Sequence, residues 1–339
     1  MQRDRLARRV AIPLHVRPDC TRPPAGELHR IGGPTMGTSW SVTYADLRAR
    51  THLLQVVSNM LAVVIRQMST WEPTSVVSRI NATAGRSAWH DVPTEFATVL
   101  SCALRIAAET GGAYDPAVGR LVDLWGFGPP GRRGPPSSSE LKTAHVESAW
   151  KRVEFDAPNG RVRLREGARL DLSSIAKGFA VDLVAQALRR DGIDHCLVEI
   201  GGELRGAGVK PDGLPWWVRI DPGYGGLREE RHPLVALHDL SIATSGSERS
   251  FTARGQRYCH TIDPRTGMPI DNGTISASVL HPSCMEADGY ATAMMVMRPD
   301  EAMAFADRHQ LAVALLHETD ADAPAERIST ALAQMIDED

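Results

Sequence analysis

Hydrophobic residues recur at helical spacing in four segments of the chain. Between Leu53 and Met68 they fall on one face, and the same pattern between Glu95 and Thr110 ends at Gly111-Gly112. This spacing matches the turn of an α-helix, and a glycine pair is typical of a helix end. We therefore predict helices over Leu53 to Met68, Glu95 to Thr110, Asp171 to Arg190 and Ala287 to Met297.

Shorter stretches of apolar and β-branched residues lie between these predicted helices. Ser39 to Tyr44 alternates between polar and apolar residues, which predicts a strand after the Met36-Gly37-Thr38 turn. Strand clusters between segregated helices favour the α+β class, namely a single compact domain of mixed or antiparallel sheets with flanking helices. The further predicted strands are His195 to Ile200, Trp216 to Ile220, Val235 to Leu237, Tyr258 to Ile262 and Ile275 to Leu280.

The ends of the chain differ in composition from its middle. Residues 1–32 are rich in Arg and Pro, so we expect an irregular leader, with the fold beginning near Gly33. The domain is then expected over residues 33–325, followed by a C-terminal tail over residues 326–339. Within the domain, the Pro, Gly and Ser content of Pro129 to Ser139 predicts an exposed loop.

The overall composition is that of a globular protein and excludes several classes. The 339 residues are 42% hydrophobic and 23% charged, and the formal net charge is only −3. No long basic run follows residue 10, so a nucleic-acid partner is not expected. The five cysteines, including Cys20, are widely spaced without a C-x-x-C pair, which argues against a zinc site or a disulfide framework.

The N-terminal segment lacks the features of an export signal. Its apolar stretch from Val10 to Val16 is interrupted by Pro13 and His15, and Cys20 follows residues unlike those of a lipid-attachment site. No later segment has the roughly 18 consecutive apolar residues of a membrane span. We therefore expect a cytoplasmic protein without a transmembrane segment, with a periplasmic or membrane-associated location as the alternative.

Asp171 to Gly178 combines a carboxylate, two hydroxyls and the ammonium of Lys177 at a predicted helix start. Exposed N–H groups and the helix dipole favour an anion at such a position, which suits a nucleotide or its phosphates. The structural alternative is equally open: Asp171 or Ser173 caps the helix and Lys177 is solvated.

Asp288 and Thr292 are four residues apart in the predicted helix from Ala287 to Met297. Their oxygens therefore face the same way and are suitable ligands for Mg²⁺ or Ca²⁺, with further ligands from elsewhere, such as a carbonyl near Ser174. By themselves, such residues are more often solvated or structural. Tyr290, Met294 and Met297 are expected to form one apolar stripe on this helix.

Two polar segments near the predicted C-terminal strands are candidates for chemistry. His260 to Gly267 joins a strand to a turn built on Asp263-Pro264, and a histidine there could move a proton near neutral pH. Thr244 to Arg249 is interpreted as a polar connection between strands that could present N–H groups to a phosphate. The alternatives are that His260 is a half-buried strand residue and that Thr244 to Arg249 is a plain loop. Gly201-Gly202-Glu203 has the same two interpretations.

Aromatic residues and glycines are concentrated between Gly111 and Pro129. This composition lets the backbone approach a planar ligand closely, although packing of Tyr114, Trp125 and Phe127 explains it equally well. Trp71, after Met68-Ser-Thr, could likewise cover a ring or fill the core.

Taken together and in this order, these segments resemble the ApbE family of FAD:protein FMN transferases. The resemblance runs from about Gly33 to Met297. The segments that carry it are Met36-Gly-Thr, Met68-Ser-Thr-Trp71, Gly112-Ala-Tyr-Asp115 through Trp125-Gly-Phe-Gly128, Asp171 to Gly178, Gly201-Gly202, Thr244-Ser-Gly246, His260 to Gly267, and Ala287-Asp288 with Thr292.

The resemblance implies a Mg²⁺-dependent enzyme that binds FAD, releases AMP and leaves FMN on a Thr or Ser hydroxyl of an acceptor flavoprotein. By position, the residues implied to contact FAD are Met36, Trp71, Ala113, Tyr114, Asp115, Asp171, Lys177 and Ile262. Ser174, Asp288 and Thr292 are implied to hold the metal, with the backbone oxygen of Ser174 as one option, and His260 is implied to transfer the proton. Asp288 is thereby also expected to be catalytic. The sequence indicates neither the acceptor nor an oligomeric state.

Three features depart from the family pattern. The N-terminus is expected to lack a convincing export signal, Trp71 stands where tyrosine is common, and Glu199 brings a negative charge where a neutral polar residue is common. Two other functions use many of the same residues: hydrolysis of FAD by a Mg²⁺-dependent pyrophosphatase, and FAD binding without catalysis. Storage of FAD would need neither a metal nor a base, so Lys177, His260, Asp288 and Thr292 together argue against it.

Overall fold

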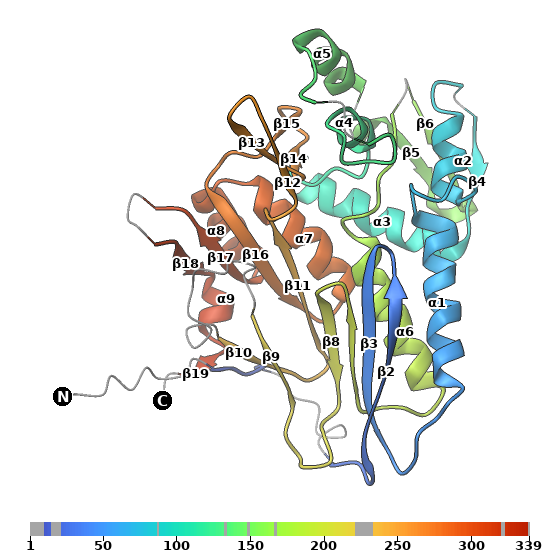
Figure 1. Ribbon diagram of the computed structural model, residues 1–339, viewed down its shortest axis with the longest axis vertical. Helices are drawn as coiled ribbons and strands as arrows, with labels where there is room; N and C mark the ends of the chain where they lie inside the picture. Colours follow the sequence, from blue (N-terminus) through green and yellow to red (C-terminus); the bar gives the residue numbers. More distant parts are fainter. Residues whose placement is uncertain are drawn as a thin grey trace, which may run out of the picture.

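The computed structural model describes residues 10–14, 22–86, 88–131, 134–147, 150–165, 168–220, 233–319 and 323–337. Its centre is an eight-stranded sheet in the order β18-β17-β16-β11-β8-β7-β3-β2, in which every neighbouring pair is antiparallel (Figure 1). The strands are β2 (Glu27–Thr35), β3 (Thr38–Asp46), β7 (Cys196–Ile200), β8 (Glu203–Ala207), β11 (Leu240–Gly246), β16 (Thr274–His281), β17 (Ala312–His317) and β18 (Ala325–Ile328).

Both faces of this sheet are buried in the part formed by β17, β16, β11 and β8. In β17, Val313 and Leu315 join the large core, whereas Ala312 and Ala314 join a second apolar cluster. Successive side chains of a strand point to opposite faces, so the two clusters cover opposite sides of the sheet. The helical layer packs on the first face, and the second is covered by α9 (Thr330–Ala333) and a small sheet.

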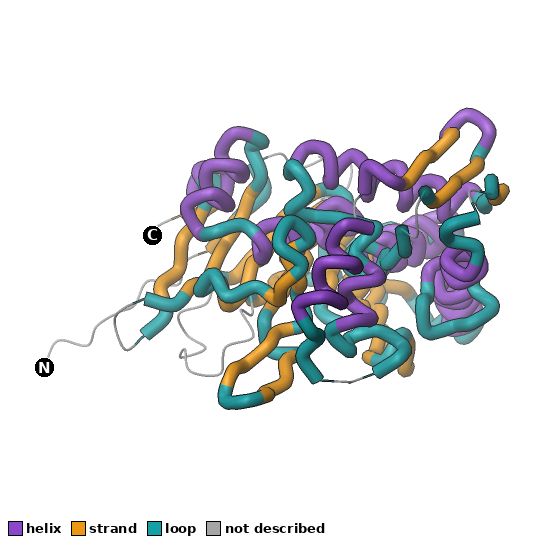
Figure 2. Tube along the Cα trace, turned by 90° about the horizontal axis from the view of Figure 1, so that it is seen from above, coloured by secondary structure: helices purple, strands orange, loops and turns teal. Residues whose placement is uncertain are grey.

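The helical layer next to the sheet consists of α6 (Ala176–Arg190) and α7 (Cys284–Val296), which also pack on each other. Outside them lie α1 (Leu53–Met68) and α3 (Thr94–Glu109), so helices and strands are segregated (Figures 1 and 2). The remaining helices are α2 (Val76–Ala82), α4 (Gly119–Leu124), α5 (Ser138–Glu147) and α8 (Pro299–Arg308).

Smaller sheets complete the fold around this centre. A four-stranded sheet has the order β19 (Ile336–Asp337), β1 (Val10–Ala11), β10 (Leu234–Leu237) and β9 (Trp216–Arg219). Two hairpins follow β11: β12 (Ser250–Ala253) with β13 (Gln256–Cys259), and β14 (Ile262–Asp263) with β15 (Met268–Pro269). The last sheet joins β4 (His90–Asp91), β6 (Arg161–Leu164) and β5 (Val153–Asp156).

The α+β class and the single compact domain are confirmed, as are the four helices and most strands, several of them with shifted boundaries. The predicted helix from Asp171 begins only at α6, because Asp171 accepts hydrogen bonds from the N–H and hydroxyl of Ser173 and closes a turn of its own. The strand predicted over Tyr258 to Ile262 is divided between β13 and β14. Thr244 to Gly246 is not a connection, because it pairs with β16 as the end of β11.

The flanking segments contain regular structure that their composition did not indicate. Within residues 1–32, β1 pairs with β10 and β19, and β2 begins at Glu27, so the leader is not irregular throughout. Residues 1–9 and 15–21, which include Cys20, lie outside the described residues. Of the helices described, none has the length and apolar character needed to cross a membrane.

Candidate active site

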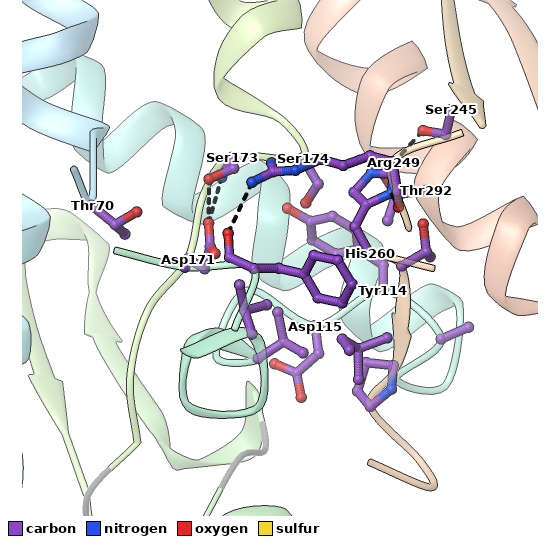
Figure 3. A pocket seen from close by; sticks show the side chains of 18 of the residues that line it. Thr70, Tyr114, Asp115, Asp171, Ser173, Ser174, Ser245, Arg249, His260 and Thr292 are labelled. Atoms are coloured by element: carbon purple, nitrogen blue, oxygen red, sulfur yellow. Dashed lines mark hydrogen bonds between the residues drawn. The ribbon is translucent and has the colours of Figure 1, made fainter. Parts of the chain in front are cut away.

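One cavity gathers most of the residues singled out in the sequence (Figure 3). Its walls come from the segment before α2, the turn after α3, the segment before α6, the end of β11, the β13–β14 connection and α7. These segments lie far apart in the chain, so only the fold brings them together. The predicted residues in its lining are Trp71, Ala113, Tyr114, Asp115, Asp171, Ser174, His260, Ile262 and Thr292.

Three predicted residues do not line this cavity. Met36 occupies the tip of the β2–β3 hairpin with φ of 48° and packs against the large core. Asp288 is only 3% exposed, beneath the first turn of α6. Lys177 turns toward β8, where its ammonium forms an ion pair with Glu203.

His260 is held in one tautomer by the backbone. The carbonyl oxygen of Arg249 accepts hydrogen bonds from the His260 N–H at 2.9 Å and from its Nδ1 at 3.2 Å. Because a carbonyl only accepts, Nδ1 carries a proton and Nε2 of the neutral ring has a free lone pair. Burial, and then the charge of Arg249, lower the pKa of His260 to about 4. The ring is therefore a neutral proton acceptor at pH 7.

Two side chains of the turn after α3 form the floor of the cavity. Tyr114 is 1% exposed, and its hydroxyl lies beside Ser174 without a hydrogen bond of normal geometry among the described residues. Burial raises the pKa of Asp115 to about 6, although its carboxylate accepts hydrogen bonds from the N–H groups of Ala117 and Trp150. A buried hydroxyl without a partner is a costly arrangement that a bound ligand would relieve.

Asp171 and the residues after it have a structural role as well as a place at the cavity. The Asp171 carboxylate accepts from the Ser173 N–H at 2.9 Å, and the Asp171 N–H donates to the Pro116 carbonyl at 2.8 Å. Asp171 therefore stabilises its own turn, as the structural interpretation expected. That turn also places Ser173 and Ser174 at the cavity (Figure 3).

The residues implied to hold a metal lie on both sides of the α6–α7 contact. Oδ2 of Asp288 accepts from the Gly178 N–H at 2.9 Å, and the Thr292 and Ser245 hydroxyls are 3.3 Å apart. Burial raises the pKa of Asp288, and the charge of Lys177 opposes that shift.

This donor set has only one carboxylate. The described part of the chain contains no group of three or more His, Cys, Asp or Glu that could hold a metal. Mg²⁺ commonly takes one or two carboxylates and completes its shell with water and substrate phosphates. A carboxylate flanked by hydroxyls fits that cation when the substrate is a pyrophosphate.

The fold also adds residues that the sequence did not single out as site residues. Arg249 lines the cavity beside His260, and its guanidinium donates to the Phe127 carbonyl at 3.1 Å (Figure 3). Ser245, Thr70 and Phe127 are further lining residues. The polar run Thr244 to Arg249 was the available signal, but nothing in its spacing indicated that Arg249 would face a histidine eleven residues later.

Comparisons with known proteins identify the family and support the fold. The profile of the ApbE family matches residues 36–316. A protein of Vibrio cholerae named FAD:protein FMN transferase is 39% identical over 302 residues, which cover 88% of this chain and 89% of that one. The solved flavin transferase ApbE from Vibrio cholerae superposes with a TM-score of 0.82 at 35% identity, covering 91% of this chain and 99% of the other. Pseudomonas stutzeri flavinyl transferase ApbE, in its apo form, gives 0.83 at 31% identity, covering 91% and 96%.

The fold, the cavity and these relatives define an enzyme of the transferase class. The chain belongs to the ApbE family.

Proposed function

We propose that this chain transfers the FMN half of FAD to a Thr or Ser hydroxyl of an acceptor flavoprotein and releases AMP. The observation that carries the proposal is the cavity itself. It places the free Nε2 of His260 in one pocket with Ser174 and Thr292, above the buried Asp288. Relatives from Vibrio cholerae and Haemophilus influenzae are named FAD:protein FMN transferase.

The proposed reaction exchanges one phosphorus–oxygen bond for another. The acceptor hydroxyl oxygen bonds to the phosphorus of the FMN half, and the bond from that phosphorus to the oxygen shared with AMP breaks. AMP leaves with the shared oxygen and the negative charge. Nε2 of His260 takes the hydroxyl proton, a role that its neutral state at pH 7 supports.

Negative charge on the pyrophosphate repels an incoming oxygen, so the site has to provide positive charge. The guanidinium of Arg249 lines the cavity, and the ammonium of Lys177, which is paired with Glu203, would add a second positive charge. Asp288, Thr292 and Ser174 would hold a divalent cation, which we propose to be Mg²⁺. When bound, Mg²⁺ neutralises charge on the phosphate oxygens.

The remaining predicted residues would bind the rest of FAD. Trp71 is 59% exposed at the cavity, so its indole face is available for stacking on a flavin or adenine ring. Tyr114 and Ile262 supply buried apolar surface, and Ala113 permits close approach of the backbone. Asp115 and Asp171 would contribute polar contacts, and Met36 would contact a part of FAD that extends beyond the cavity.

The test is incubation with FAD, Mg²⁺ and candidate acceptor flavoproteins, followed by intact-mass analysis of each acceptor. We expect an FMN-sized mass increase that denaturation does not remove, with an equal amount of AMP. Asp288→Ala should abolish both products while remaining folded, because it removes the only carboxylate of the donor set. Production of AMP without a mass increase would indicate hydrolysis instead. Absence of AMP would indicate a binding protein.

A further inference from the structure

The ion pair between Lys177 and Glu203 is unusual because the carboxylate is almost completely buried. Glu203 is the first residue of β8 and is 1% exposed, whereas the Lys177 side chain remains 31% exposed. Oε1 of Glu203 accepts a hydrogen bond from Nζ of Lys177, and Oε2 has no partner among the described residues. Burying a charged carboxylate is costly, and such a pair is weak support for stability.

The aliphatic part of Lys177 is confined by the turn that precedes Glu203. A Cβ atom added at Gly201 would lie 2.8 Å from Cγ2 of Thr38 and 3.4 Å from Cδ of Lys177. Gly201 also has φ of 62°, which favours glycine at this position. The β7–β8 turn, Thr38 and Glu203 therefore form a slot that directs the ammonium of Lys177 toward β8.

A second buried carboxylate lies on the other side of the same helical turn. Asp288 accepts a hydrogen bond from the N–H of Gly178, the residue after Lys177. The described ion pairs of Lys177 do not include Asp288, although the Asp288 carboxylate is 2.9 Å from the backbone nitrogen of the adjoining residue Gly178. Lys177 thus lies between two carboxylates and is bonded to only one of them.

We propose that Glu203 is a positioning residue that holds the ammonium of Lys177 away from Asp288 and so leaves that carboxylate free for a divalent cation. The inference rests on the proposed metal role of Asp288. An ammonium bound to Asp288 would occupy the oxygens that the cation needs. Without Glu203, the ammonium of Lys177 would be free to turn toward Asp288, which is hydrogen-bonded to the next residue of the same helix.

Binding of Mn²⁺ to the acceptor-free protein, measured from the electron paramagnetic resonance signal of the free ion, tests this inference without reference to activity. Glu203→Asp keeps the charge but shortens the side chain, so it should lose its hold on Lys177 and weaken Mn²⁺ binding by roughly tenfold or more. Glu203→Gln should weaken binding at least as much. Adding Lys177→Met to either variant should restore the wild-type affinity to within about twofold, because the competing ammonium is gone.

Controls separate this role from a general effect of charge or folding. Glu109→Gln removes a paired carboxylate of α3 that does not line the cavity and should leave the Mn²⁺ affinity unchanged. Melting temperatures establish that each variant is folded.

Wild-type affinity in Glu203→Asp, or no recovery on adding Lys177→Met, would overturn the positioning role while leaving the metal assignment in place. Failure of the wild-type protein to bind Mn²⁺ would overturn the metal assignment and the positioning role together.

Discussion

His260 has an environment that favours its neutral form, and this has a consequence for the pH dependence of transfer. Burial and the Arg249 charge lower its pKa to about 4, below the usual value for histidine. The group is active when deprotonated, so His260 itself limits activity only as the pH falls through that lowered pKa. We expect the profile of kcat/KM for FAD to show no histidine pKa near 6.5, and any loss of activity near pH 6 to come from Asp115, whose pKa burial raises to about 6.

Replacing Arg249 by Gln should raise the pKa of His260, because a positive charge that disfavours imidazolium is removed while the backbone carbonyl remains. The pH at which activity falls on the acidic side of the profile would then shift toward neutral pH. Comparison of the two pH–rate profiles checks both expectations. A wild-type limb near 6.5 would contradict the assignment of His260 as a buried neutral base.

The exposure of Trp71 separates two interpretations that the sequence left open. At 59% exposure it does not fill the core, so Trp71→Ala should change the apo melting temperature little. If it stacks on FAD equally in the ground and transition states, Trp71→Ala should raise the KM for FAD roughly five- to thirtyfold and keep kcat within about twofold. Trp71→Tyr should be nearly neutral. Steady-state kinetics of the two variants and thermal melts test this prediction, and a large stability loss would contradict it.

At the scale of elements, the site depends on how closely α6 approaches α7. A Cβ atom at Gly178 would lie 2.3 Å from the Cys284 carbonyl oxygen and 2.7 Å from Cβ of Asp288. Real Cβ atoms do not approach backbone this closely, so α6 or α7 would have to move. Only glycine at this position lets the Gly178 N–H reach the Asp288 carboxylate.

Gly178→Ala should therefore destabilise the protein by about 1–3 kcal/mol and weaken Mn²⁺ binding, because the helices must separate. Gln186→Ala, at an exposed position of the same helix, should change stability by less than about 0.5 kcal/mol. Urea unfolding of both variants measures the difference. Equal stability of the Gly178 variant and the wild type would show that the contact is more adaptable than the distances indicate.

At the scale of the whole molecule, segments near the two ends of the chain pack on the face of the central sheet that lies away from α6 and α7. β1 pairs with β19, and α9 places Leu332, which is 0% exposed, in the apolar cluster on the face away from α6 and α7. Ser329 caps α9 and donates to the Leu311 carbonyl. Residues 326–337 are therefore part of the packed fold.

Leu332→Ala should cost about 2–5 kcal/mol of unfolding free energy, the usual range for a buried leucine, although the residue lies outside the segment that matches the family profile. Thr330→Ala, two residues earlier at an exposed position, should cost much less. The urea midpoint of each variant gives the comparison. A fully stable Leu332 variant would mean that the segment after residue 325 packs only loosely.

The sequence by itself determined the elements whose pattern is local. Helical spacing identified Leu53–Met68 with the bounds that the structure has, and alternation identified the strand around Ser39 to Tyr44. The order of short motifs also identified the family and most residues of the cavity. These predictions succeeded because periodicity and motif order depend on neighbours along the chain.

Only the tertiary structure decided which polar side chains face one another. Tyr290, Met294 and Met297 predicted a single apolar stripe on α7, but the helix is buried on all sides. The reason is that α7 lies between the sheet and other helices. That burial raises the pKa of Asp288. In the same way, the contact of Lys177 with Glu203 joins residues whose pairing depends on where β8 passes α6. A contact between distant segments is fixed by the packing of whole layers, so it leaves no periodic pattern in the sequence.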